Sequence, residues 1–248
     1  MSGFKDHFSG HAQAYAASRP GYPDALFDWL AEHAPGRGMA WEAGCGSGQA
    51  TVALAARFSR VHASDPSAEQ IARAPALPGV VFTVAGAEDC SLPDAGCDLV
   101  AVAQALHWFD LPRFWPQVQR VLRPGGLFAA WTYGLCSVSP AVDAVFHRLY
   151  EDRLGPYWPP ERRLVEAGYR DIAMPLAPVP APAFAIRLDW TQAQYLAYLR
   201  SWSAHARCLR ETGVDAVSTL QADFAAAWGD AATRTVVWPL AVLAGRRP

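Results

Sequence analysis

Residues 39–48, with the sequence MAWEAGCGSG, decide the fold. The apolar run 39–43 is typical of a buried strand, and three glycines at alternate positions follow it directly. Glycine adopts backbone conformations that other residues avoid, and it lets a ligand approach the main chain with no Cβ in the way. Residues 49–58 fit a helix whose first turn presents free N–H groups. The stretch therefore predicts a βα unit with a ligand-binding turn.

Strands and helices alternate on both sides of this unit. Beyond the first unit, the sequence predicts strands at 60–64, 80–84, 97–103 and 127–133, helices at 4–18, 24–33, 67–73 and 111–122, and a tight turn at 123–126. Such alternation indicates a parallel sheet with right-handed crossovers and helices on both faces. The predicted fold class is α/β, a doubly wound, mostly parallel seven-stranded sheet of the Rossmann-like type, with helices on both faces and an antiparallel C-terminal edge.

The pattern is looser after residue 135. A helix is expected at 140–152, and the four prolines of 174–182 indicate an ordered crossover. The remainder predicts a strand at 184–190, a helix capped by Thr191, a helix at 213–228 and a strand at 234–243. This remainder is too short for a core of its own. We therefore expect one domain over 1–248, made of a helical lid (1–35), a cofactor-binding core (36–135) and a substrate-side part (136–248).

Composition excludes several classes of function. The chain has 248 residues, of which 52% are hydrophobic and 18% charged, and a net charge of −2. Its basic residues are scattered, so no nucleic-acid partner is predicted. Five cysteines without CxxC spacing indicate reduced thiols, and no apolar run is long enough for a membrane partner. These features predict a cytoplasmic protein and leave the oligomeric state open.

An acidic residue ends the second predicted strand of the sheet. Asp65 follows Gly46 by about 20 residues, the spacing at which a carboxylate accepts hydrogen bonds from ribose hydroxyls. Asp65 before Pro66 and Ser67 also suits a helix N-cap, which is the alternative. The glycine loop makes ribose binding the favoured interpretation. The loop 85–89 falls where an adenine would lie, although a solvated acidic turn explains it equally well.

The glycine spacing differs from two related nucleotide-binding motifs. The third glycine comes one residue too early for the dinucleotide fingerprint, and no Gly-Lys-Ser/Thr follows as in a P-loop. A nucleoside with an amino-acid tail fits this loop better than a pyrophosphate does.

These elements, in this order, resemble class I S-adenosylmethionine-dependent methyltransferases. Residues 121–127, VLRPGGL, are similar to the turn before the fifth strand of that family. The segments 8–23, 104–110 (QALHWFD) and 200–203 (RSWS) resemble, more narrowly, the trans-aconitate methyltransferase group. The resemblance implies S-adenosyl-L-methionine as cofactor and a small-molecule acceptor whose methylated atom belongs to a carboxylate, hydroxyl, thiol or nitrogen group.

The resemblance also implies which residues contact the cofactor. Glu42 would lie near the methionine amino group, and Asp65 would hold the ribose. Gln104 would face the methionine moiety, and Arg19 would lie near its carboxylate. The full set of implied contacts is Tyr15, Arg19, Glu42, Ala43, Gly44, Cys45, Gly46, Asp65, Pro66, Gln70, Ala87, Glu88 and Gln104.

His107 is the candidate catalytic residue. It follows strand 97–103 at the carboxyl edge of the sheet, where ligands bind in open α/β folds. It is a candidate base or substrate hydrogen-bond donor, with a packing role at a helix start as the alternative. The candidate substrate contacts are His11, Trp108, Tyr133 and Trp202, with core packing as the alternative for the aromatic residues. His7 and His11 lie four apart without an evident third ligand, so no metal site is predicted.

Two other functions share the glycine loop and the acid. An NAD-dependent oxidoreductase would need a base at the hydride site, and the Tyr-x-x-x-Lys arrangement is impossible because Lys5 is the only lysine. A non-catalytic protein that binds the cofactor as a sensor is the other alternative.

Overall fold

A computed structural model describes residues 21–248 of the chain. The helix predicted at 4–18 lies outside the described residues, and so do three predicted site residues, His11, Tyr15 and Arg19.

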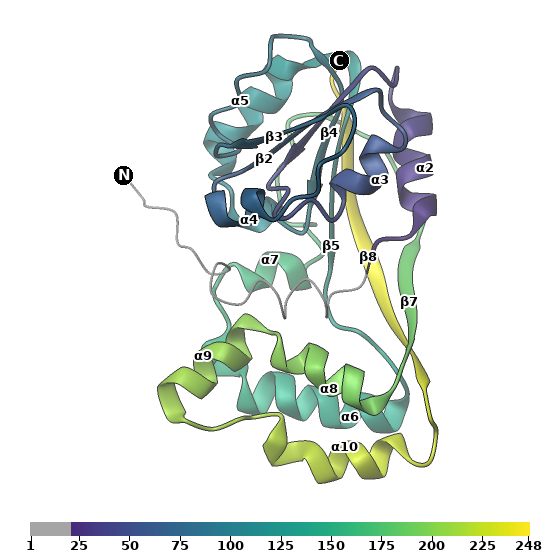
Figure 1. The fold of residues 1–248 in the computed structure, drawn as a ribbon, viewed down its shortest axis with the longest axis vertical. Coiled ribbons are helices and arrows are strands. Elements are labelled where there is room, and N and C mark those ends of the chain that lie inside the picture. The colour runs from purple at the N-terminus through teal and green to yellow at the C-terminus, as the bar shows by residue number, and fades with distance from the viewer. Residues whose placement is uncertain (1–20) are drawn as a thin grey trace.

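One eight-stranded sheet runs through the molecule in the order β3-β2-β1-β4-β5-β8-β6, with β7 also paired to β8 (Figure 1). The strands from β3 to β5 pair in parallel, whereas β8 pairs antiparallel to β5, β6 and β7. The predicted fold class, mostly parallel with an antiparallel C-terminal edge, is confirmed. The strands are β1 Met39–Ala43, β2 Arg60–Asp65, β3 Val80–Val84, β4 Cys97–Ala103, β5 Leu122–Tyr133, β6 Ala177–Pro178, β7 Phe184–Trp190 and β8 Arg234–Arg246.

The helices fall into two groups. The first flanks the sheet, with α2 and α3 on one side and α5 on the other (Figure 1). The second, which we call the helical cap, consists of α6, α8, α9 and α10 and lies beyond the carboxyl end of β5, with α7 between it and the sheet (Figure 1). The helices are α2 Asp24–His33, α3 Thr51–Ala55, α4 Ala68–Ala72, α5 Leu111–Val121, α6 Pro140–His147, α7 Arg162–Glu166, α8 Gln192–Arg200, α9 Ser203–Thr212 and α10 Gln221–Trp228. None of the helices within residues 21–248 has both the length and the apolar content needed to cross a membrane.

The central strands are buried on both faces, which explains why their sequences are continuously apolar. Alternate residues of β1 and β4 point to opposite sides. Ala40 and Leu99 belong to the core beneath α2, whereas Trp41 and Val100 belong to the core beneath α5. The parallel pairing then brings the loops that follow β1, β2, β3, β4 and β5 to one edge of the sheet.

Two predictions about the sheet are wrong in detail. Eight strands form instead of seven, because the proline-rich segment adds the short edge strand β6. Residues 123–126 are part of β5 instead of a tight turn before it, and the β4–β5 register shifts between Cys97 and Leu99. The stretch forms a bulge in which Gly125 has a left-handed φ of +75°, and main-chain hydrogen bonds of 2.9 Å from Gly125 to Arg247 and from Arg247 to Gly126 hold it in place. Arg247, which pairs with this stretch, is distant in sequence, so no pattern near residues 123–126 predicts the pairing.

The helical cap also departs from prediction. The helix expected at 213–228 begins only at Gln221, and a separate helix, α9, precedes it. Gly213 ends α9 with a left-handed φ of +73°, the usual conformation after a helix C-terminus. The helix expected at 140–152 is α6 followed by a π-helical turn, Arg148–Arg153. The Thr191 cap is confirmed, and Gln194 completes a capping box with it.

Candidate active site

The glycine loop links β1 to the segment after β4. Gly44, Gly46 and Gly48 all have positive φ, at +70°, +55° and +88°. A Cβ on Gly44 would lie 2.7 Å from the Cβ of Ala105, so this glycine is required for close packing against the 105–109 segment. A Cβ on Gly46 would meet no described atom within 4 Å, so the main chain there borders open space. The loop therefore has one packed side and one side that a ligand can approach.

Asp65 braces this loop from the end of β2. Its Oδ2 accepts a hydrogen bond of 2.9 Å from the Gly46 amide, and its Oδ1 accepts one of 2.9 Å from the Ser67 amide. Ser67 is the N-cap of α4, because its Oγ accepts from the Gln70 amide. The alternative in which Asp65 itself caps the helix is therefore wrong. Each carboxylate oxygen can accept more than one hydrogen bond, so the brace is compatible with ribose hydroxyls as further donors.

Glu42 is a fully buried acid beneath the loop. Its Oε2 accepts a hydrogen bond of 2.5 Å from Thr51 Oγ1, while its Oε1 has no hydrogen-bond partner among residues 21–248. Burial raises the pKa of Glu42 to about 8, the Thr51 bond opposes this rise, and the nearby charge of Asp65 adds to it. A buried carboxylate oxygen without a partner is costly. A cationic amino group beside the loop would satisfy it, so these residues fit the amino-acid end of S-adenosylmethionine.

The loop after β3 lies at the same edge of the sheet. Ala87 is buried there, and Glu88 Oε1 accepts a hydrogen bond of 2.8 Å from the Asp110 amide at the start of α5. Gln70, on α4, is also buried. The predicted ribose and adenine contacts, with Ala43 and Pro66, thus follow the adjacent strands β1, β2 and β3.

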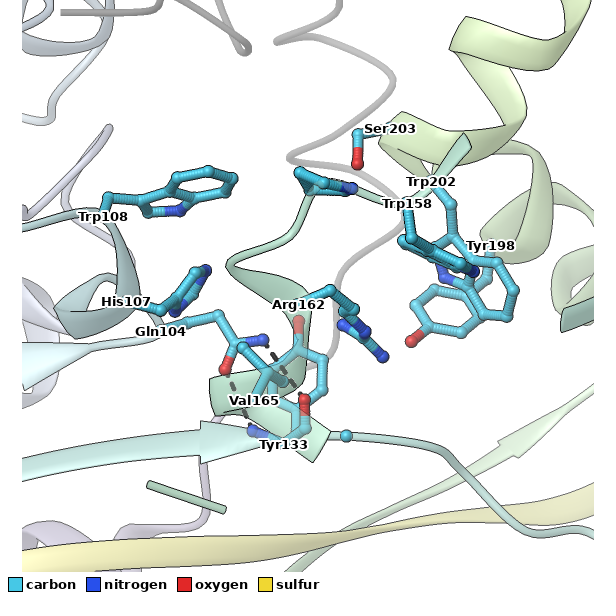
Figure 2. A pocket seen from close by; sticks show the side chains of 12 residues that line it. Gln104, His107, Trp108, Tyr133, Trp158, Arg162, Val165, Tyr198, Trp202 and Ser203 are labelled. Atoms are coloured by element: carbon cyan, nitrogen blue, oxygen red, sulfur yellow. Dashed lines mark hydrogen bonds between the residues drawn. The ribbon is translucent and has the colours of Figure 1, made fainter. Parts of the chain in front are cut away.

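A pocket lies between the end of the sheet and the helical cap (Figure 2). On the sheet side it is bordered by residues that follow β4 and β5, and on the other side by residues of α7, α8 and the loops beside them. The lining residues are Gln104, His107, Trp108, Tyr133, Gly134, Trp158, Pro159, Arg162, Val165, Tyr198, Trp202 and Ser203. The structure thus brings together five residues that the sequence singled out for the acceptor side or the cofactor edge, namely Gln104, His107, Trp108, Tyr133 and Trp202.

Gln104 holds the ends of β4 and β5 together. Its backbone has a left-handed φ of +54°, which is strained for a residue with a Cβ. Its Oε1 accepts from the Tyr133 amide at 2.9 Å, and its Nε2 donates to the Tyr133 carbonyl at 3.2 Å. These two main-chain partners fix which end of the side-chain amide is oxygen. Oε1 also accepts a hydrogen bond of 2.7 Å from Thr132 Oγ1.

His107 lies beside a buried tyrosine. Thr132 Oγ1 donates to Gln104 Oε1, and the Tyr169 side chain is buried near Thr132. Burial raises the pKa of Tyr169, so its hydroxyl keeps its proton. Tyr169 Oη lies 2.9 Å from His107 Nδ1, and which of the two atoms donates depends on the tautomer of the imidazole. This hydrogen bond orients the His107 ring from its Nδ1 side.

Stacked aromatic side chains form the wall on the cap side of the pocket. The ring centroids of Trp158 and Trp202 are 5.4 Å apart, and that of Tyr198 lies 5.7 Å from Trp202. The Arg162 guanidinium lies 4.8 Å from the Trp158 ring centroid (Figure 2). Arg162 and Tyr198 were not identified from the sequence. No motif marks them, because they reach the pocket only through the packing of the cap onto the sheet.

Cys45 is poorly suited to act as a thiolate nucleophile. It is buried within the glycine loop, and burial raises the pKa of its thiol. Within residues 21–248, no three His, Cys, Asp or Glu side chains cluster in a way that could hold a metal ion.

Comparison with known proteins agrees with the geometry. Residues 41–130 match the family described as "Methyltransferase domain". A protein of Dictyostelium discoideum, named as a candidate methyltransferase, is 33% identical over 222 residues, which cover 88% of this chain and 84% of that protein. An uncharacterized methyltransferase of Mycobacterium tuberculosis is 43% identical over 121 residues, about half of each chain. A solved structure described as a candidate type II methyltransferase from Anaeromyxobacter dehalogenans has 50% identity and a TM-score of 0.87, and the alignment covers 92% of this chain and 97% of that one.

Proposed function

Because this chain belongs to the class I S-adenosylmethionine-dependent methyltransferases, we propose that it methylates a small molecule held between His107 and the helical cap. It is an enzyme, and its methyl donor is S-adenosylmethionine. The observation that carries the proposal is the packing of Gly44 against Ala105, which joins the glycine loop to the segment that bears His107. A methyl donor on the loop and an acceptor in the pocket would then be neighbours.

In this proposal, each residue of the cofactor site contacts a different part of S-adenosylmethionine. Glu42 binds the amino group through its unpartnered Oε1. Asp65 holds the ribose, and Ala87 and Glu88 border the adenine. Gly46 lets the main chain approach the ligand, since no Cβ stands between them. When bound, the cofactor supplies an electrophilic methyl group together with its own leaving group.

On the acceptor side, the protein contributes orientation and one basic nitrogen. An in-line displacement needs the attacking atom held close to the methyl carbon and aligned with the breaking bond. The rings of Trp108, Trp158 and Trp202 restrict how an acceptor lies in the pocket. His107 accepts the proton of an acceptor hydroxyl or amine, and Tyr169, whose Oη lies 2.9 Å from Nδ1, orients the imidazole. A carboxylate or thiolate acceptor would need no base, and His107 would then only orient it.

The proposal also divides the chain by task. Residues 36–135 bind the cofactor, and residues 136–248 supply the cap side of the acceptor pocket. The two alternatives that the sequence left open, an oxidoreductase and a non-catalytic sensor, are less consistent with membership of this family than methyl transfer is.

The direct test is incubation of the purified protein with S-adenosylmethionine labelled in the methyl group and a metabolite extract. We expect one or a few small molecules to gain the label, and mass spectrometry then identifies the acceptor. Calorimetry with S-adenosylmethionine, S-adenosylhomocysteine and NAD supplies the binding control. Binding of NAD, with no binding of either sulfur ligand, would contradict the proposal. If the protein binds the cofactor but transfers label to no small molecule, the proposal that the methyl acceptor is a small molecule is contradicted.

A further inference from the structure

Arg162 gives the pocket a distinct electrostatic character. Among the lining residues that belong to the described range 21–248, it is the only one of the Asp, Glu, Lys and Arg types. Its side chain is largely buried, with 17% exposed. An arginine keeps its charge under all ordinary conditions. Within the described part of the chain, the pocket therefore has one fixed positive charge and no fixed negative charge among its lining side chains.

The Arg162 guanidinium is held in place from one side only. Its Nε donates a hydrogen bond of 2.8 Å to Tyr150 Oη, and Tyr150 Oη donates to the Glu166 carboxylate. The carboxylate of Glu166 is also 3.9 Å from Arg162 Nε. Glu166 is not among the residues that line the pocket and borders a second hollow on the other side of Trp158 and Arg162. The Glu166 carboxylate and the Tyr150 hydroxyl therefore anchor Arg162 through its Nε.

The terminal nitrogens of Arg162 are left for another partner. No hydrogen bond or ion pair within residues 21–248 reaches Nη1 or Nη2. The guanidinium carbon lies over two rings, 4.8 Å from the Trp158 centroid and 5.5 Å from the Tyr150 centroid, which limits the space in which the group moves. In Figure 2 it lies between Gln104 and Tyr133 on one side and Tyr198 on the other. A fixed guanidinium fork with free N–H groups matches the two oxygens of a planar oxyanion.

We propose that Arg162 is the specificity-determining residue of the acceptor pocket and that the acceptor is an organic anion whose carboxylate, or chemically similar oxyanion, pairs with Nη1 and Nη2. This inference rests on the proposed function, because it concerns the acceptor of the same site. The aromatic rings around the guanidinium suit an acceptor that has an apolar or planar part beside its anionic group. A cationic acceptor would be repelled by Arg162, since the part of the lining that the structure describes offers it no acidic side chain.

The first test measures binding and does not depend on turnover. Benzoate and benzamide have similar shapes and differ in charge, and each is titrated into the protein saturated with S-adenosylhomocysteine, with calorimetry as the readout. We expect benzoate to bind at least ten-fold more tightly than benzamide, and the preference to disappear in Arg162→Met. The matched control is Arg163→Gln, because Arg163 is its exposed neighbour on α7 and does not line the pocket. Equal affinities for the two probes, including no binding of either, would overturn the proposal.

The second test uses the natural acceptor. A metabolite extract is separated by anion exchange into retained and unretained fractions, and each fraction is incubated with methyl-labelled S-adenosylmethionine. We expect the label in the retained, anionic fraction, with at least a ten-fold loss of transfer in Arg162→Met but not in Arg163→Gln. Cofactor affinity and thermal unfolding of both variants show whether they are folded. Labelling of the unretained fraction would overturn the proposal that the acceptor is anionic, while the proposed methyl transfer would stand. No labelling of any fraction would count against the proposed function itself.

Discussion

The backbone amide of Gly46 donates a hydrogen bond of 2.9 Å to Oδ2 of Asp65, across 19 residues of sequence. The bond joins the loop after β1 to the end of β2, so the two predicted halves of the cofactor site support each other before any ligand binds. Oδ1 of the same carboxylate holds the Ser67 amide at the start of α4. Asp65 therefore shapes the glycine loop and, in our proposal, also binds the ribose.

The first prediction separates these two roles. We expect Asp65→Ala to weaken S-adenosylmethionine binding by about 1–3 kcal/mol, because the ribose hydroxyls lose an ionised partner. Ser67→Ala removes the helix cap and keeps the Asp65 carboxylate, so it should cost about 1 kcal/mol of stability, with little effect on affinity. Calorimetry and thermal unfolding of both variants give the comparison. A folded Asp65→Ala protein with unchanged affinity would leave Asp65 a purely structural role.

Most of the cofactor half of the molecule was predictable from sequence. The bounds of β3, β4 and β7 were predicted to the residue, because each is a short apolar run between turn residues. The meeting of Gly46 and Asp65 follows from the parallel order of β1 and β2, which strand–helix alternation implies. These features depend on signals within a few residues or on one general rule of connection.

The helical cap was less predictable, because its arrangement depends on packing between distant segments. The helix α7 has five residues, too few to show a period, and it is placed by buried Val165 and Tyr169. Arg162 lies in the pocket only because this helix docks between the sheet and the cap. The 203–212 segment contains His205, which is buried and hydrogen-bonded to Asp215 at 2.8 Å, a contact that no pattern in the helix reveals.

The second prediction concerns the proton on Glu42. With its pKa raised to about 8, the buried carboxyl is mostly protonated in the free enzyme at pH 7. A cationic ligand beside it favours the ionised form, so binding should release close to one proton below pH 8, and affinity should rise up to about ten-fold per pH unit until the slope flattens near pH 8. Calorimetry in buffers of different ionisation enthalpy counts the protons.

Glu42→Gln is the matched variant for this measurement. It should bind the cofactor more weakly and without the proton release, and any slope that remains belongs to other groups. The same raised pKa has a consequence for stability. The stabilisation from this group in the free enzyme is full below the unfolded value of 4.5 and is lost as the pH rises through about 8. Proton release that persists unchanged in Glu42→Gln would show that Glu42 does not meet the ligand.

The third prediction distinguishes two glycines of one loop. Gly46→Ala places a methyl group in open space at φ +55°, so we expect it to cost about 1–2 kcal/mol of stability from the left-handed conformation and, in addition, to obstruct the cofactor. Gly44→Ala also forces a contact of 2.7 Å with Ala105 and should destabilise the fold by about 1–3 kcal/mol more. Thermal unfolding ranks the two variants. If Gly46→Ala binds S-adenosylmethionine normally, the space beside it is not the cofactor site.

The last prediction tests the pair formed by His107 and Tyr169. We expect His107→Ala to lower kcat by about 100-fold or more for a hydroxyl or amine acceptor, with cofactor affinity nearly unchanged, because a positioned base is lost. Tyr169→Phe removes the hydroxyl that is hydrogen-bonded to Nδ1 and should lower kcat by about ten-fold with KM little changed. If Tyr169 acts only through the imidazole, the Phe substitution has no further effect in the His107→Ala background, and the double-mutant cycle measures this directly. A structural role for Tyr169 would instead give additive losses together with a lower thermal midpoint, and full activity of His107→Ala at every pH would remove His107 from the reaction.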